Sequence, residues 1–343
     1  MSRTTIPTPE NAADHYRHGG DIDQARRNYP NAIEPWIDLS TGINPFAYPI
    51  PTLESDAWTR LPLKEEEFEL RSASAFCYGA PDVDAIVSAP GTQALIQIIP
   101  RLIEPTQVAI IGPTYSEHAR CWQRLGHSTM EIETLDEIES ARVVVVVNPN
   151  NPTGRHYAPQ QLLSLAEEMT HRRGLLIVDE AFADLLGIEH SVVPLEPPST
   201  IILRSFGKTY GLAGLRLGFA ITQRKTAAQL REWLGPWAVS GPALAIGRQA
   251  LKDSRWLADM RGRVKDARER LERLLVAAGC DVLGGTPLFL LASHPRAANV
   301  AHTLATNAIH VRQFSDQPTW LRFGIPQGSA WRRIEAALLS LSP

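Results

Sequence analysis

Short apolar runs alternate with longer amphipathic stretches through the middle of this chain. The runs are too short to form helices, and three are nearly all apolar, as strands buried on both faces are. They are Gln107–Ile111, Arg142–Val147, Leu175–Val178, Thr200–Leu203 and Leu217–Ile221. Between them, Thr92–Ile103, Ser116–Leu125 and Pro159–Arg172 have the pattern of helices. The alternation predicts an α/β fold whose mostly parallel sheet is covered by helices on both faces.

The length of 343 residues favours two domains, because single cores stop growing near ~250–300 residues. The first forty residues are polar and lack periodicity, and the pattern changes again after about residue 222, where a long charged helical stretch, Pro242–Ala278, begins a second α/β region. The later strands and helices are expected at Leu288–Ala292, Trp320–Gly324, Arg296–Asn307 and Ser329–Ser340. We therefore expect an N-terminal arm (1–35), a large domain (36–225) and a small C-terminal domain (226–343).

Composition excludes several classes of function. The net charge is −3, with acidic and basic residues interspersed, so no nucleic-acid partner is expected. No apolar run approaches the length of a membrane span, and the polar N-terminus lacks a signal-peptide pattern, so we expect a soluble cytoplasmic protein. The nearby Asp14, His15 and His18 could suggest a metal site, but a firm third ligand is missing. No metal is therefore expected. The widely separated cysteines are expected to be reduced thiols: Cys77, Cys121 and Cys280.

A lysine stands in a glycine-rich turn directly after an apolar strand, within the segment Ser205–Gly218. Most lysines are solvated surface charges. Here, however, Ser205 lies three residues before Lys208 and Arg216 eight residues after it, so a hydroxyl and a guanidinium could bind one phosphate. The segment indicates a lysine that can meet an aldehyde in a phosphate-bearing ligand.

Three further motifs also follow predicted strands. Asp179 ends an apolar strand, Asn148–Gly154 repeats Asn-Pro after another, and Gly91 and Thr92 join a strand to a helix. Taken singly, each could be an ordinary loop, turn or helix start. Ligands of open α/β sheets bind at the carboxyl ends of the strands, so together they predict one ligand site.

These segments, S-F-x-K-x-x-G-L-A-G-L-R-x-G, D-E-A-F and N-P-x-N-P-T-G, resemble those of fold-type-I pyridoxal-5′-phosphate (PLP) enzymes of the histidinol-phosphate aminotransferase branch, over roughly residues 36–326. The resemblance implies the aspartate-aminotransferase-like fold, with a seven-stranded sheet in the large domain, and a homodimer. It implies that Lys208 attaches PLP as a Schiff base, Asp179 pairs with the ring nitrogen and Asn151 contacts the ring 3′-oxygen. Its other implied cofactor contacts are the phosphate ligands Gly91, Thr92, Ser205 and Arg216, and the ring-stacking Tyr115.

Two departures point away from an ordinary histidinol-phosphate aminotransferase. Phe182 stands where that branch usually has tyrosine, and Leu61-Pro62-Leu63 stands where it usually has Tyr-Pro-Asp. Both departures remove a hydroxyl that in the branch reaches the cofactor.

The arm motif His18-Gly19-Gly20-Asp21 and the later Asp38–Pro45 segment are similar to those of the threonine-phosphate decarboxylase family of cobalamin biosynthesis. This likeness implies that Arg322 binds the substrate carboxylate. Arg312, His18 and the backbone at Gly19 and Gly42 would bind the substrate phosphate, and Asn151 would also contact the substrate. The expected reaction converts L-threonine O-3-phosphate to (R)-1-aminopropan-2-ol O-2-phosphate and CO2. A histidinol-phosphate or related aminotransferase, and a non-catalytic PLP-sensing regulator, remain alternatives.

Overall fold

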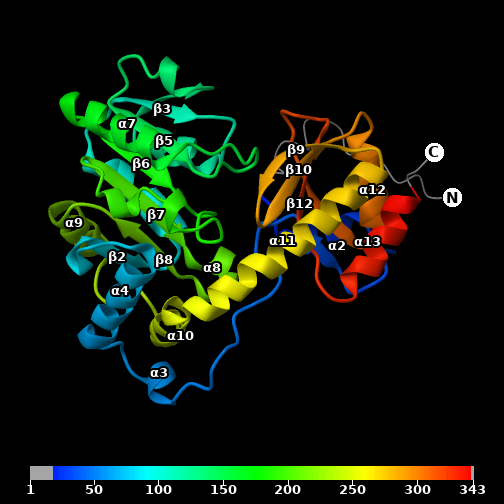
Figure 1. Ribbon diagram of the computed structural model, residues 1–343, viewed down its shortest axis with the longest axis horizontal. Helices are drawn as coiled ribbons and strands as arrows, with labels where there is room; N and C mark the ends of the chain where they lie inside the picture. The colour runs from blue at the N-terminus through cyan, green and yellow to red at the C-terminus, as the bar shows by residue number, and fades with distance from the viewer. Residues whose placement is uncertain (1–17, 341–343) are drawn as a thin grey trace. The chain divides into compact units, whose positions relative to one another are not determined.

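The computed structural model describes residues 18–340. Its contacts divide the chain into a larger unit, Phe46–Gly262, and a smaller unit that combines the chain before Phe46 with the chain from Arg263 onward. Each unit contains one sheet and helices of its own, and helix α11 (Ser254–Ala277) continues from one unit into the other (Figure 1). The grouping differs from the expected limits, because residues 36–45 join the smaller unit and residues 226–262 the larger. The limits at residues 35 and 225 therefore stay a prediction.

The larger unit is built on a seven-stranded sheet, and this confirms the predicted fold class. Its strands, in spatial order, are β2 (Ile86–Ala89), β8 (Gly218–Ile221), β7 (Thr200–Ser205), β6 (Leu175–Asp179), β5 (Val143–Val147), β3 (Gln107–Ile111) and β4 (Ser128–Ile132). Only β8 among them runs antiparallel to its neighbours. All five predicted central strands are present. The strand expected before Gly91 is β2, whereas β4 was not predicted.

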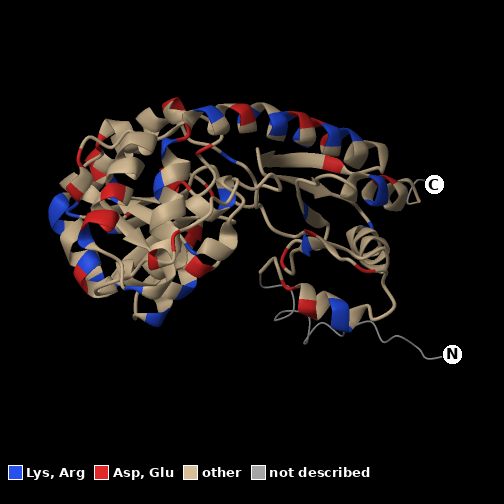
Figure 2. Ribbon diagram, turned by 90° about the horizontal axis from the view of Figure 1, so that it is seen from below, with Lys and Arg blue, Asp and Glu red and all other residues tan. Residues whose placement is uncertain are grey.

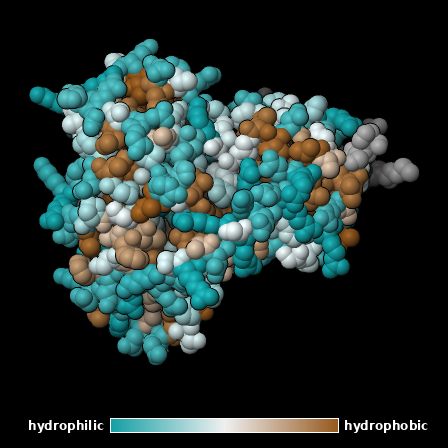
Figure 3. Space-filling view, in the orientation of Figure 1, coloured by the Kyte–Doolittle hydropathy of each residue, from teal (hydrophilic) through white to brown (hydrophobic). Residues whose placement is uncertain are grey.

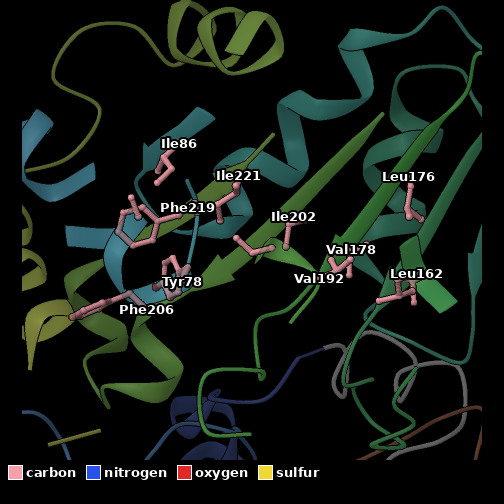
Figure 4. Packing of buried hydrophobic residues seen from close by; sticks show 14 of the residues in the cluster. Tyr78, Ile86, Leu162, Leu176, Val178, Val192, Ile202, Phe206, Phe219 and Ile221 are labelled. Carbon is pink, nitrogen blue, oxygen red and sulfur yellow. The ribbon is translucent and has the colours of Figure 1, made fainter. Parts of the chain in front are cut away.

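Both faces of this sheet are buried, which explains why its central strands are almost entirely apolar. Along β5, Val144 and Val146 pack into one hydrophobic cluster, and Val143 and Val145 pack into another. Successive side chains of a strand point to opposite faces, so one five-residue run supplies two cores. Figure 4 shows part of the first cluster, with side chains from β6, β7 and β8.

Helices cover the sheet of the larger unit, and most of the predicted ones are present. They are α3 (Asp56–Thr59), α4 (Lys64–Tyr78), α5 (Thr92–Ile98), α6 (Glu117–Arg124), α7 (Pro159–His171), α8 (Phe206–Thr209), α9 (Arg224–Leu234) and α10 (Gly241–Lys252). The continuous helical stretch expected from Pro242 to Ala278 was wrong. It breaks at Asp253, whose carboxylate accepts a hydrogen bond from the Trp256 N–H at 2.9 Å and so caps the start of α11 (Ser254–Ala277).

The smaller unit has a five-stranded sheet in the order β1 (Ile37–Leu39), β11 (Ile309–Gln313), β12 (Trp320–Gly324), β10 (Phe289–Ser293) and β9 (Asp281–Thr286). Helices α12 (Ala297–Thr306) and α13 (Ala330–Leu339) match the expected ones closely. The arm, for which no helix was predicted, contains α2 (Ile22–Asn28). The Asp21 carboxylate caps this helix by accepting from the Gln24 N–H at 2.9 Å.

The surface carries both charges throughout. Figure 2 shows acidic and basic residues interspersed along α11 and over both units. Figure 3 shows hydrophobic residues in separate patches on a largely hydrophilic face. Within residues 18–340, no helix has the length and apolar character needed to cross a membrane.

Candidate cofactor and substrate sites

The residues predicted to bind the cofactor follow strands of the larger unit at one edge of its sheet. Asp179 ends β6, Ser205 ends β7 and is followed by α8 with Lys208, and Gly91 follows β2. The loop that contains Asn151 follows β5. Because these strands are parallel to one another, their carboxyl ends meet at the same edge, where open α/β sheets bind ligands.

Asp179 is held as a buried carboxylate. Its Oδ2 lies 2.9 Å from His118 Nε2, and its Oδ1 accepts from the Ala181 N–H at 3.0 Å. Burial raises the pKa of Asp179, but the hydrogen bond and attraction of His118, the attraction of Lys208 and the Ala181 bond outweigh it, so the pKa lies below the ordinary value. Asp179 is therefore ionised at neutral pH and can keep a protonated ring nitrogen paired.

Sequence reasoning missed His118. It lies in the first turn of α6, three residues after Tyr115, and is almost fully buried. A histidine on the apolar face of a helix carries no signal of its own. Its place after the carboxyl end of β3, at the same sheet edge as Asp179, was the available clue.

Lys208 lies in a tight turn between a polar and an apolar neighbour. Its Nζ is 3.4 Å from Ser205 Oγ and 5.1 Å from the centroid of the buried Phe182 ring. The preceding Gly207 cannot carry a side chain, because a Cβ there would lie 2.8 Å from Ala213 Cα. Phe182, identified from the sequence as a departure, thus forms an apolar wall beside the lysine amine.

The four predicted phosphate ligands gather at the same end of the sheet. Gly91 has φ +84°, and a Cβ on it would lie 2.8 Å from Arg216 Nη2, so the guanidinium lies against the glycine backbone. Ser205 pairs in register with Gly218, whose Cβ would lie 2.5 Å from the Thr92 nitrogen. A hydroxyl, a guanidinium and backbone N–H groups are therefore close together, as a phosphate requires.

Tyr115 lies next to His118, the hydrogen-bond partner of Asp179. Its hydroxyl donates to Gln93 Oε1 at 3.2 Å, and its ring meets that of His118 edge to face with centroids 6.1 Å apart. Burial, with the carboxylates of Glu117 and Asp179, raises the pKa of Tyr115 to about 12, so its hydroxyl stays protonated.

Hydrogen bonds of the neighbouring Asn150 hold the loop that carries Asn151. Asn150 Nδ2 donates to the Pro113 carbonyl at 2.9 Å and to Thr153 Oγ1 at 2.7 Å, and Asn150 Oδ1 accepts from Thr114 Oγ1 at 2.6 Å. Asn151 itself is half-buried. Its role toward a cofactor or substrate stays a prediction.

The predicted substrate residues lie in the smaller unit. Arg312 on β11 and Arg322 on β12 are directly opposite in an antiparallel register. Burial lowers the pKa of Arg312 to about 10, and burial together with repulsion from Arg312 lowers that of Arg322 to about 9. Arg322 Nη2 also donates to the Ser40 carbonyl at 2.5 Å. Two like charges placed side by side favour an anionic ligand.

The arm residues lie around Ser40. A Cβ on Gly19 would lie 2.2 Å from the Ser40 carbonyl oxygen, so only glycine fits, and the Gly20 N–H donates to Ser40 Oγ at 2.7 Å. Gly42 is buried just after β1. His18 is exposed and lines a pocket that Arg312 also lines.

Asp14 and His15 lie outside the described residues. Among residues 18–340, no group of three or more histidine, cysteine, aspartate or glutamate side chains could hold a metal ion. The cysteines are free thiols. Leu61 and Leu63, the second departure, are exposed between α3 and α4.

The family model for aminotransferase class I and II matches residues 36–337. The chain belongs to this family. Within it, the chain is 41% identical to a threonine-phosphate decarboxylase of Pseudomonas aeruginosa, with 94% of this chain and 97% of that protein covered. It is 42% identical to a threonine-phosphate decarboxylase of a Sinorhizobium species, again with 94% of this chain and 97% of that protein covered. It is 30% identical to a histidinol-phosphate aminotransferase of Bacillus cereus over 71% of this chain and 70% of that protein.

Solved members of the aminotransferase family have the same fold. A histidinol-phosphate aminotransferase from Sinorhizobium meliloti, solved with pyridoxal-5′-phosphate, has a TM-score of 0.80 at 19% identity and covers 100% of this chain and 98% of its own. L-threonine-O-3-phosphate decarboxylase from Porphyromonas gingivalis has a TM-score of 0.73 at 18% identity, with 89% and 98% covered. The resemblance and fold inferred from the sequence are confirmed.

Proposed function

We propose that this chain is a PLP-dependent decarboxylase that converts L-threonine O-3-phosphate to (R)-1-aminopropan-2-ol O-2-phosphate and CO2, and so supplies the aminopropanol linker of cobalamin. The relatives at 41 and 42% identity support this, because they carry the name threonine-phosphate decarboxylase and match nearly their whole length. The matched histidinol-phosphate aminotransferases are more distant, at 27–30% identity.

The residues of the larger unit fit PLP. The observation behind this fit is the buried, ionised Asp179, together with the Arg216 guanidinium against Gly91. Lys208 would attach the cofactor, Asp179 would pair with its ring nitrogen, and Tyr115 and Asn151 would contact the ring. Gly91, Thr92, Ser205 and Arg216 would bind its phosphate. When bound, PLP supplies an electron sink for the charge left at the substrate Cα.

The opposed guanidinium groups of Arg312 and Arg322 are the observation that carries the choice of substrate. A ligand with two anionic groups relieves their repulsion, and the substrate proposed here has a carboxylate and a phosphate. Arg322 would hold the carboxylate, while Arg312, His18 and the backbone at Gly19 and Gly42 would hold the phosphate. Binding the two groups separately fixes the orientation of the substrate. Lys208 Nζ or a water molecule would return a proton to the substrate Cα.

The proposal includes a cytoplasmic homodimer. Its support in this chain is a set of exposed apolar side chains around α3, where Trp58, Leu61 and Leu63 are 67%, 61% and 53% exposed. Large contiguous apolar patches on a protein surface mark protein–protein interaction sites. Sedimentation of the purified protein at twice the chain mass tests this part.

One assay tests the reaction. The PLP-loaded protein is incubated with L-threonine O-3-phosphate, and CO2 and aminopropanol phosphate are measured. We expect both products in equal amounts without any keto acid. Absence of CO2, or turnover of histidinol phosphate that forms glutamate from 2-oxoglutarate, would overturn the proposal in favour of an aminotransferase.

A further inference from the structure

A second ionisable side chain lies on the same strand face as Arg312. Along β11, Ile309 and Val311 are buried, whereas His310 and Arg312 are half-buried and point to the opposite face. Residues two apart on a strand are separated by about 6.6 Å, which a bound phosphate and its contacts can bridge. The neighbouring strand β1 places Asp38 directly beside His310 in register.

His310 and Arg312 line one pocket of the smaller unit. The arm and α2 contribute His18 and Asp21 to its wall, and α12 contributes the small apolar residues Ala301 and Ala305. Among residues 18–340, no hydrogen bond of the His310 ring is found. The nearby Asp38 carboxylate, in contrast, already accepts from the Ser40 N–H and hydroxyl at 2.8 and 2.6 Å. The imidazole therefore retains its hydrogen-bonding capacity for a ligand.

We propose that His310 binds the substrate phosphate together with Arg312 and takes up a proton as it does so. The inference rests on the proposed function, since it deepens the recognition of that substrate. Nothing in the sequence motifs marked His310, because it lies outside the arm and the two arginine positions.

The charged groups around His310 determine how the affinity for the phosphate changes with pH. Burial lowers the pKa of His310 and so does Arg312, while Asp38 and Asp21 raise it, and the balance lies below the ordinary value. The imidazole is thus mostly neutral at pH 7 without ligand. A phosphate dianion favours its protonated form, so affinity rises as the pH falls from 8.5 to 6.5. Below about pH 6 the phosphate itself becomes protonated, which bounds the useful range.

Steady-state kinetics of the PLP-loaded enzyme with L-threonine O-3-phosphate test this. We expect the KM of the unmodified enzyme to fall roughly three- to tenfold between pH 8.5 and 6.5. His310→Gln should have a higher KM without that dependence, with kcat nearly unchanged. His310→Lys should keep a low KM at both pH values, because its charge does not titrate there. His171→Gln, an exposed control on α7, should behave as the unmodified enzyme does. An unaltered KM profile in His310→Gln would overturn the inference.

A binding measurement separates this inference from the reaction. Inorganic phosphate is titrated into the PLP-loaded protein at pH 7.5 in two buffers of different ionisation heat, so that proton uptake is measured directly. We expect uptake that His310→Gln abolishes. Such uptake without CO2 release would sink the proposed reaction and keep the His310 site. Equal uptake in both proteins, or no binding of phosphate, would sink the His310 site even if CO2 is released.

Discussion

The cofactor edge of the larger unit and the arginine pair of the smaller unit treat charge in opposite ways. At the cofactor edge, the buried Asp179 has a partner in His118 and attraction from Lys208, and its pKa is lowered. In the smaller unit, Arg312 and Arg322 stand opposite each other in register; burial lowers both pKa values, and Arg312 lowers that of Arg322 further. The first arrangement pairs groups of opposite charge, whereas the second places two like charges in register, an arrangement that a bound anion would stabilise.

The difference matches the two roles proposed for these regions, cofactor binding and substrate binding. Groups that tune a permanently held cofactor gain from fixed partners, since these hold their charge and orientation. Groups that capture a substrate keep unfavourable interactions in the free protein, and ligand binding relieves them. Substitutions in the two regions should therefore differ in how they divide between activity and stability.

The largest effect is expected at Lys208. Replacing Lys208 by Ala should lower decarboxylation on the order of 10³-fold or more, because the amine that attaches the cofactor and can carry a proton is lost. The visible absorbance of the bound cofactor should also disappear, while the far-UV circular dichroism stays unchanged. Lys225→Ala on the exposed face of α9 is the matched control. Persistence of the Schiff-base absorbance would mean that another lysine attaches PLP.

A substitution of Arg322 should lower activity without lowering stability. Arg322→Met is expected to lower kcat/KM about 10²- to 10³-fold, as truncating one partner of a buried charge contact does. The Tm of the protein without substrate should not fall, because the repulsion from Arg312 disappears and apolar volume is kept.

Thermal unfolding with and without L-threonine O-3-phosphate measures the second part. The substrate should raise the Tm of the unmodified protein and of the exposed control Arg332→Met, but not that of Arg322→Met. A marked fall in the Tm of substrate-free Arg322→Met would contradict the contrast between the two regions.

The sequence alone could predict the central strands and the motif residues, but not how distant residues pair. The five central strands were found because burial on both faces leaves a nearly continuous apolar run, as in β5. The edge strand β4, Ser128–Ile132, was missed because it is partly exposed and mixes polar with apolar residues. Asp179, Ser205 and Lys208 were found because they end or closely follow such strands.

The interactions between motifs were beyond sequence reasoning. That Arg312 stands opposite Arg322 depends on the register of two antiparallel strands, and a slip of one residue would place them on different faces. The same holds for His310 beside Asp38. His118 was missed because its partner is 61 residues away in the chain. Residue types in the sequence indicate the chemistry, but the pairing of strands and the packing of helices determine which groups interact.

The smallest effect is expected at His118, the partner of Asp179 at the cofactor edge. His118→Asn should lower kcat about tenfold and reduce the free energy of unfolding at pH 7 by about 1.5–3 kcal/mol, the range for a hydrogen bond to a charged group. Because the pKa of Asp179 is lowered in the folded protein, this stabilisation is present above the ordinary aspartate pKa, near 3.9, and is lost as the pH falls below it. Denaturant unfolding at pH 7 and at pH 3 measures the difference, with His171→Asn on α7 as the exposed control. A stability difference that is equal at both pH values would show that His118 acts by packing and not by holding the Asp179 carboxylate.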